Sequence, residues 1–166
     1  MFGKTKYFAV ILFVVILLSG CNTNEVKNDQ EDLFSYKDSY VGDNAAVGHI
    51  TKALPSPGGE SVSSLELKTK EEPYGVIVKY KDVALTGTIE KNYKETALYN
   101  ATFLFTLVHN AEWVQFNFVE ESVKVNRDEL QEWYGKNLSG FESEDEVTAL
   151  IQNQLKNESN LHDYFK

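Results

Sequence analysis

The sequence predicts an α+β fold, with a mainly antiparallel sheet of about four strands and helices packed on one face of it. Two observations carry this prediction. Two pairs of short segments alternate apolar and polar residues, with few residues between the members of each pair, which is typical of β-hairpins. Stretches with helical apolar spacing precede, separate and follow the two hairpins. The expected order is therefore helix, hairpin, helix, hairpin and two further helices.

The first 21 residues resemble a bacterial lipoprotein signal peptide that ends in a lipobox. Lys4 and Lys6 precede an apolar run over residues 7–18, and Leu-Ser-Gly leads directly into Cys21, the single cysteine of the chain. A charged start, an apolar stretch of secretory length and small residues at the cleavage point form a removable export signal. The run is well short of the ~20 residues that span a bilayer as a helix. The alternative is a short uncleaved anchor in which Cys21 is incidental.

Lipid on Cys21 would hold the mature chain on the extracytoplasmic face of the cell membrane. The chain is expected to divide into a signal peptide (1–20), the lipidated cysteine with a flexible tether (21–32) and one α+β domain (33–166). The tether is expected because residues 22–32 are polar and cannot offset their ordering entropy by burial. Once Cys21 is acylated, no thiol remains for a disulfide, a metal site or a nucleophile.

The charge of the chain limits its partners. The 166 residues carry a net charge of −9, which becomes −11 when Lys4 and Lys6 leave with the signal peptide. This balance argues against nucleic acid, which requires a basic surface, and against a domain that lies flat on anionic lipid. The charge serves solubility alone, or it complements a basic partner or a cation-rich wall polymer.

The first part of the domain is expected to be an extended lead-in over residues 33–42, followed by a short helix over 44–54. Asp43 is a suitable N-cap for this helix, and Pro55 follows its end. Three apolar residues at helical spacing form the face that docks on the sheet. These are Val47, Ile50 and Leu54.

The first hairpin is expected to pair residues 62–69 with residues 75–82 across a loop at 70–74. Residues 83–89 extend the second strand or turn at Gly87. The longest helix follows over 90–109, and its broad apolar face indicates a helix that crosses the sheet and is largely covered.

The second hairpin is expected to pair residues 113–119 with residues 122–125, and C-terminal helices follow over 126–158. Two capping boxes start these helices, Asn126 with Glu129 and Ser143 with Glu146. The last residues, which include His162, are expected to be a frayed tail.

The sequence shows no recognisable catalytic motif. His49, His109 and His162 lack the spacing of a metal site, and no nucleophile elbow, phosphate loop or dinucleotide fingerprint occurs. The acidic run at 142–146 lacks the alternating ligands of a calcium loop and suits the start of a helix. We therefore expect no catalytic residue, no metal site and no cofactor, and a protein that is not an enzyme.

Aromatic residues make up 13% of the chain, and several fall at the edges of predicted elements. Exposed tyrosine and tryptophan at such places suit a contact with protein or glycan. The alternative is that they seal the core of a modest domain. The residues in question are Tyr36, Tyr40, Tyr74, Trp113, Trp133 and Tyr134.

The stretch Tyr40-Val41-Gly42-Asp43-Asn44, followed by Val47-Gly48 and then Leu54-Pro55, resembles the DUF4825 family of bacterial secreted and lipid-anchored proteins. The resemblance extends over residues 33–125. It implies an envelope protein and, because similar domains occur beside BlaR-type membrane peptidases, an extracytoplasmic sensing or accessory module. It carries over no catalytic residue. The same stretch could serve folding alone, since Gly42 permits a turn and Asp43 a cap.

The residues expected to form a binding patch are Tyr36, Tyr40, Asp43, Asn44 and Trp113. The function expected from the sequence is a non-enzymatic binding or accessory module of the bacterial envelope, whose partner is an envelope protein or a wall polymer. The alternatives are a sensor or inhibitor of a membrane protease, and a wall-directed hydrolase with an unrecognised site. The sequence leaves the oligomeric state open.

Overall fold

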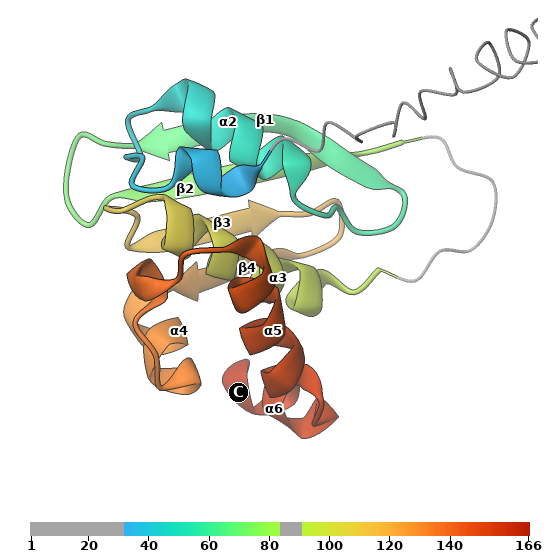
Figure 1. The fold of residues 1–166 in the computed structure, drawn as a ribbon. Helices are drawn as coiled ribbons and strands as arrows, with labels where there is room; N and C mark the ends of the chain where they lie inside the picture. Colours follow the sequence, from blue (N-terminus) through green and yellow to red (C-terminus); the bar gives the residue numbers. More distant parts are fainter. Residues whose placement is uncertain (1–31, 84–90) are drawn as a thin grey trace, which may run out of the picture. The chain divides into compact units, whose positions relative to one another are not determined.

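The computed structural model describes residues 32–83 and 91–166, and Asp32–Lys166 form one compact unit (Figure 1). The predicted signal peptide, Cys21 and most of the tether lie outside the described residues. The same holds for most of the segment 83–89, for which an extension of the strand or a turn is predicted.

The sheet contains four strands in the order β1-β2-β3-β4. Both predicted hairpins form, because β1 pairs antiparallel with β2, and β3 pairs antiparallel with β4. The central pair, β2 with β3, is parallel, so the sheet is mixed. A parallel pair needs a crossover connection, and the long helix between these strands supplies it. The strands are β1 (Glu60–Lys68), β2 (Gly75–Asp82), β3 (Trp113–Asn117) and β4 (Ser122–Asn126).

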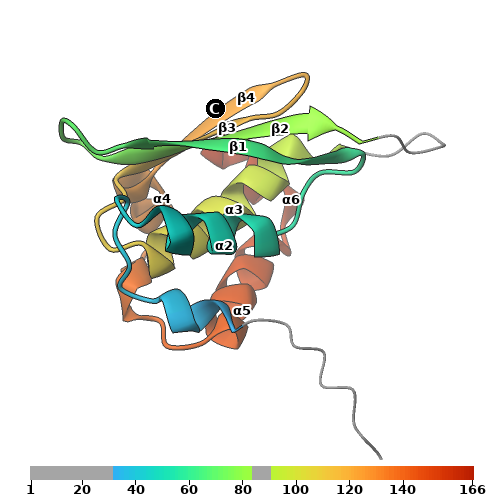
Figure 2. The same ribbon diagram turned by 90° about the horizontal axis from the view of Figure 1, so that it is seen from above.

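The helices cover one face of the sheet, as predicted (Figure 2). The crossover helix α3 is the centre of the core, and most of its side chains are buried against the sheet on one side and other helices on the other. Two short 3-10 helices, η1 (Leu33–Tyr36) and η2 (Leu138–Gly140), complete this layer. The α-helices are α2 (Asn44–Ala53), α3 (Tyr93–Leu107), α4 (Arg127–Tyr134), α5 (Glu144–Leu155) and α6 (Glu158–Tyr164).

Helix α2 begins as the sequence predicts. The Asp43 side chain accepts a hydrogen bond from the amide of Ala46 at 3.0 Å and so satisfies one of the free donors at the helix start. The predicted apolar face is buried, with Val47 and Ile50 fully covered and Leu54 5% exposed. Helix α2 thereby lies along the sheet on the side of β1 (Figures 1 and 2).

The predicted extended lead-in over residues 33–42 is wrong at its start, where η1 forms. Asp32 caps this turn, since its side chain accepts a hydrogen bond from the amide of Phe34 at 2.9 Å. The amide of Leu33 donates to the Glu144 carboxylate at 2.7 Å. A partner 111 residues away thus helps fix this conformation, and local sequence does not show it.

The C-terminal prediction needs two corrections. Residues 158–164 form helix α6 and not a frayed tail, because Tyr164 packs on Trp133 with 5.2 Å between ring centroids. The described residues of the domain therefore form five α-helices where four were expected. The capping box at Asn126 is also wrong, since its side chain makes no cap hydrogen bond and the residue belongs to β4. Ser143 does cap α5.

Candidate binding sites

A cavity of about 400 Å³ lies at one end of the sheet, between the β1–β2 loop and the α3–β3 loop. We call it the loop cavity. Its lining combines two exposed carboxylates with a half-buried tyrosine and an amide. The lining residues are Glu72, Pro73, Tyr74, Asn110 and Glu112.

The two loops that form the cavity are held together by backbone and side-chain hydrogen bonds. The amide of Glu112 donates to the carbonyl of Tyr74 at 2.9 Å, and the indole Nε1 of Trp113 donates to the carbonyl of Pro73 at 2.9 Å. The Trp113 ring lies over Gly75, where an added Cβ would come within 2.2 Å of the indole Cε2 atom. Gly75 is therefore required for this ring position. The cavity wall is built on a rigid strand end.

Trp113 is thus a support for the loop cavity more than a free contact residue. Its ring is half-buried, and the ammonium of Lys124 lies 4.7 Å from the ring centroid. This arrangement is a cation–π contact on the open face of the sheet. The tryptophan was singled out by its place at the start of a strand, and the structure assigns that place a positioning role.

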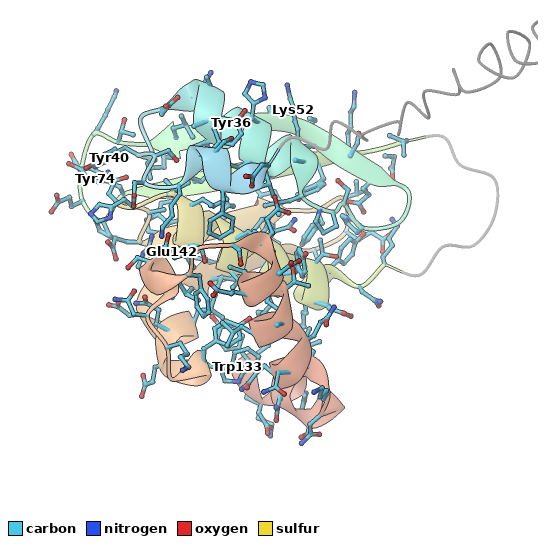
Figure 3. All side chains as sticks on the ribbon, in the orientation of Figure 1. Tyr36, Tyr40, Lys52, Tyr74, Trp133 and Glu142 are labelled. Atoms are coloured by element: carbon cyan, nitrogen blue, oxygen red, sulfur yellow. The ribbon has the colours of Figure 1, made fainter. Side chains whose placement is uncertain are left out.

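Tyr40 lies beside the same loops. The amide of Val41 donates to the Asn110 side chain at 2.8 Å, and the ring of Tyr40 meets His109 edge-on at 5.7 Å. Tyr40 is 56% exposed, which is unusual for so large an apolar ring. Figure 3 shows Tyr40 and Tyr74 at the end of the sheet where the β1–β2 loop lies.

A buried arginine, Arg127, fixes the α3–β3 loop from the interior of the domain. Arg127 donates to the carbonyls of Phe105 at 2.8 Å and Val108 at 2.7 Å, and its Nε donates to Ala111 at 2.5 Å. These contacts satisfy carbonyls that the C-terminus of α3 leaves free, and a cation is favoured there. Burial lowers the pKa of Arg127. Sequence reasoning missed this residue, and only its position after a strand could have drawn attention to it.

A second hollow of about 430 Å³ lies between helix α2 and the edge strand β1. We call it the α2–β1 groove. Asn44 lines it directly, and Tyr36 stacks on the lining residue His49 with 5.5 Å between ring centroids. The remaining lining is small or polar apart from Val62, Leu65 and Lys52. Figure 3 labels Tyr36 and Lys52 on this side of the molecule.

Gly48 is an unexpected residue in the wall of this groove. It lies in the middle of α2, where glycine costs roughly 0.5–1 kcal/mol relative to alanine. An added Cβ would meet no described atom within 4 Å, so packing within the described residues does not require glycine. A glycine that weakens a helix without a packing reason calls for another explanation.

The expected patch of five residues is therefore divided between two places. Tyr40 and Trp113 flank the loop cavity, whereas Tyr36 and Asn44 belong to the α2–β1 groove. Asp43 lies next to the groove, and its carboxylate is used as the cap of α2.

A buried carboxylate forms a further cluster that the sequence did not indicate. Glu60 is 4% exposed and accepts hydrogen bonds from the Tyr93 hydroxyl at 2.5 Å and the Val119 amide at 3.1 Å. Glu60 also forms an ion pair with Lys91 at 3.3 Å. Lys91 in turn forms an ion pair with the exposed Glu120 at 2.8 Å. Hydrogen bonding to Glu120 raises the pKa of Lys91, and burial raises that of Tyr93. The cluster joins the start of β1 to α3 and the β3–β4 turn.

Within residues 32–83 and 91–166, histidine, cysteine and acidic side chains do not gather in threes that could hold a metal ion. In that same part of the chain, none of the helices combines the length and hydropathy of a membrane span.

Comparison with known proteins gives one match. The family model DUF4825, described as a domain of unknown function, matches residues 33–128. The match includes both hollows, Arg127 and the Glu60 cluster, and it ends as α4 begins. No curated protein and no solved structure matches the chain.

Proposed function

We propose that this chain, which belongs to the DUF4825 family, is a lipid-anchored extracytoplasmic module that binds a ligand of the bacterial envelope and is not an enzyme. The loop cavity is the observation that carries the proposal. It presents a tyrosine and two carboxylates on loops that are fixed to the ends of β2 and β3. Such a rigid, partly aromatic surface suits recognition.

The chemistry of the cavity favours a cationic group. Glu72 and Glu112 are the charged residues among its five lining residues, and both are exposed. Carboxylates and an aromatic ring together attract an ammonium or guanidinium group, through charge-assisted hydrogen bonds and cation–π contact. The net charge of −9 also favours approach by a basic partner. The proposed ligand is therefore an amine-bearing wall polymer or a basic segment of an envelope protein.

Lipid on Cys21 is the anchor in this proposal. Its support is the position of the single cysteine after a charged start and an apolar run. Cells that express the full chain should incorporate a clickable fatty acid into it, and Cys21→Ser should remove the label and release the protein from the membrane. Label that persists on Cys21→Ser would overturn the anchor without affecting the cavity.

The ligand site is tested with the full chain in detergent micelles and a peptidoglycan fragment that carries a free amino group as the probe. The variant Glu72→Gln with Glu112→Gln should lose at least tenfold in affinity. Glu71→Gln should retain the affinity, because Glu71 is exposed on the same loop but does not line the cavity. Acetylation of the amino group of the probe should have the same effect as the double variant.

Two results would contradict this function. Equal binding by the double variant and by Glu71→Gln would separate the cavity from ligand recognition. Cleavage of wall material by the purified chain, abolished by a single substitution, would show an enzyme in place of a binding module. Crosslinking in intact cells from a photoreactive group at Tyr74 should identify the partner when the ligand is a protein.

A further inference from the structure

We infer that the α2–β1 groove binds an extended acidic peptide, which adds as a further strand to the free edge of β1. This inference concerns a different surface from the loop cavity and does not depend on the proposed function. It combines an edge strand, a helix beside it, a glycine and the charge of the groove.

The edge of β1 offers backbone hydrogen-bonding groups to a partner. β1 has nine residues and lies at the end of the sheet, and among the described residues it pairs with β2 alone. Residues 61–65, Ser-Val-Ser-Ser-Leu, carry no charge that would discourage pairing. A register shift between Val62 and Ser64 interrupts the pairing with β2, and the strand on either side of it offers edge groups that can template an added strand.

Helix α2 supplies the second wall that such a peptide needs. Six residues of the helix between Asn44 and Lys52, together with residues 62–65 of the strand, line the same hollow of about 430 Å³. A strand that is added to β1 would therefore lie between a sheet edge and a helix, with alternate side chains directed toward the helix. Ala45, Gly48 and Asn44 are small enough to leave room for these side chains.

A peptide bound in the groove would explain why position 48 of α2 is a glycine. A side chain there has open space in front of it in the described structure, and that space is the groove. A peptide in the groove would meet the helix backbone at this point, where any larger residue would collide with the peptide. The occupied groove thus accounts for a glycine that the helix itself disfavours.

The charge of the groove selects an acidic occupant. Lys52 is exposed, lines the groove and makes no ion pair with another described residue. None of the ten lining residues is acidic, although the chain as a whole has 25 aspartate and glutamate residues against 16 lysine and arginine residues. The N-terminus of α2 at Asn44 and Ala45 adds the positive end of a helix dipole to the same side.

The probe is a blocked nine-residue peptide that alternates glutamate with valine, titrated against the full chain in detergent micelles. We expect saturable binding, at least tenfold weaker binding of the same peptide with lysine in place of glutamate, and at least tenfold loss with Gly48→Leu. Lys52→Glu should lose about threefold to tenfold. The matched control Lys81→Glu, an exposed residue on β2 outside the groove, should change little.

Folding and strand pairing are checked separately. Gly48→Ala should raise the melting temperature of the chain and still lower its affinity for the peptide. That combination excludes misfolding as the cause of the weaker binding. Methyl groups on alternate amides of the peptide should abolish binding in one register and spare it in the other, because only alternate residues of a strand face its neighbour.

Four binding results would overturn the inference. These are the absence of saturable binding of the acidic peptide, equal binding of the lysine peptide, unchanged binding by Gly48→Leu, and equal tolerance of both methylated peptides. Concentration-dependent dimers that Gly48→Leu abolishes would assign the groove to a second copy of the chain and would also overturn it.

Discussion

Among the residues that the structure describes, two charged side chains are buried, and the two are satisfied in opposite ways. Arg127 donates to the carbonyls of Phe105 and Val108 at the end of α3 and of Ala111 in the loop that follows, and its acceptors among the described residues are all backbone carbonyls. Glu60 accepts from Tyr93 and Val119 and shares its charge with Lys91, which reaches the surface at Glu120. Arg127 therefore caps a helix inside the domain, whereas Glu60 is connected to the surface through Lys91 and Glu120.

The difference shows how a buried charge can be held mainly by hydrogen bonds to backbone carbonyls. A helix C-terminus collects partial negative charge, and the carboxylates of Glu112 and Asp128 act on Arg127 only as nearby charges. Glu60 lies at the start of a strand, which has no helix dipole to stabilise a charge. Its carboxylate therefore relies on the Tyr93 hydroxyl, the Val119 amide and Lys91. We expect the Arg127 cap to be more sensitive to substitution than the Glu60 cluster.

The largest effect is expected for Arg127→Met. The substitution relieves the desolvation of the guanidinium but removes its hydrogen bonds to the carbonyls of Phe105 and Ala111, and it leaves the Val108 carbonyl with the Ala111 amide alone, at 3.3 Å. The free energy of unfolding should fall by about 2–4 kcal/mol. Urea denaturation measures this, with Lys136→Met on the surface as the control. A loss as small as that of the control would contradict the role of Arg127 as the cap of α3.

Alkaline pH is expected to act through Tyr80, beside Glu60. Burial, with a smaller contribution from the charge of Glu60, raises the pKa of Tyr80 to about 12. The unfolded chain releases this proton near pH 10 and the folded chain does so near pH 12, so stability is complete below pH 10 and falls between these values.

The slope of this loss should approach about 1.4 kcal/mol per pH unit for Tyr80. Buried Tyr134 and Tyr164 add to it, because burial raises their pKa in the same direction. Denaturant titrations at several pH values measure the slope, and Tyr80→Phe should make it shallower. An unchanged slope in that variant would show that Tyr80 does not contribute.

Glu60→Gln tests the second buried charge. Glutamine can accept from Tyr93 but must direct its own donor toward the Val119 amide or Lys91, so one buried contact is lost. We expect a loss of about 1–3 kcal/mol in the free energy of unfolding. Glu66→Gln is the control on the same strand, because the Glu66 side chain is 40% exposed and its ion pairs with Lys68 and Lys79 lie near the surface. A greater loss than that of Arg127→Met would reverse the comparison.

The smallest effect is expected for Lys91→Met. Lys91 is 24% exposed at its side chain and joins Glu60 to Glu120. Pairs near the surface contribute about 0.2–1 kcal/mol, and salt screens them. The stability difference from the wild type should therefore shrink at high ionic strength, whereas that of Arg127→Met should not. A salt-independent difference would place the Lys91 pair among the buried interactions.

The sequence was most informative where local patterns and burial agree. Alternation predicted both hairpins, and the apolar face of α3 predicted a largely covered helix that packs across the sheet. Asp43 was identified as the cap of α2 because capping depends on residues only three positions apart. The errors at η1 and α6 have the opposite origin, since Glu144 and Trp133 lie far from them in the sequence.

The candidate sites were only partly predictable. Tyr40 and Trp113 were selected as aromatic residues at element edges and Asn44 from the stretch that resembles the family, and each lies in or beside a hollow. Their division between two surfaces could not be foreseen, because the parallel pairing of β2 with β3 decides which loops meet. The carboxylates of Glu72 and Glu112 come together for the same reason.

The sequence by itself determined the fold class, the two hairpins and the start of α2, because periodicity and capping act between near neighbours. Tertiary structure alone decided that Arg127 caps α3, that Glu60 is buried, and that Gly48 opens into a groove. Each of these depends on contacts between elements far apart in the chain. Local residue patterns do not record such contacts.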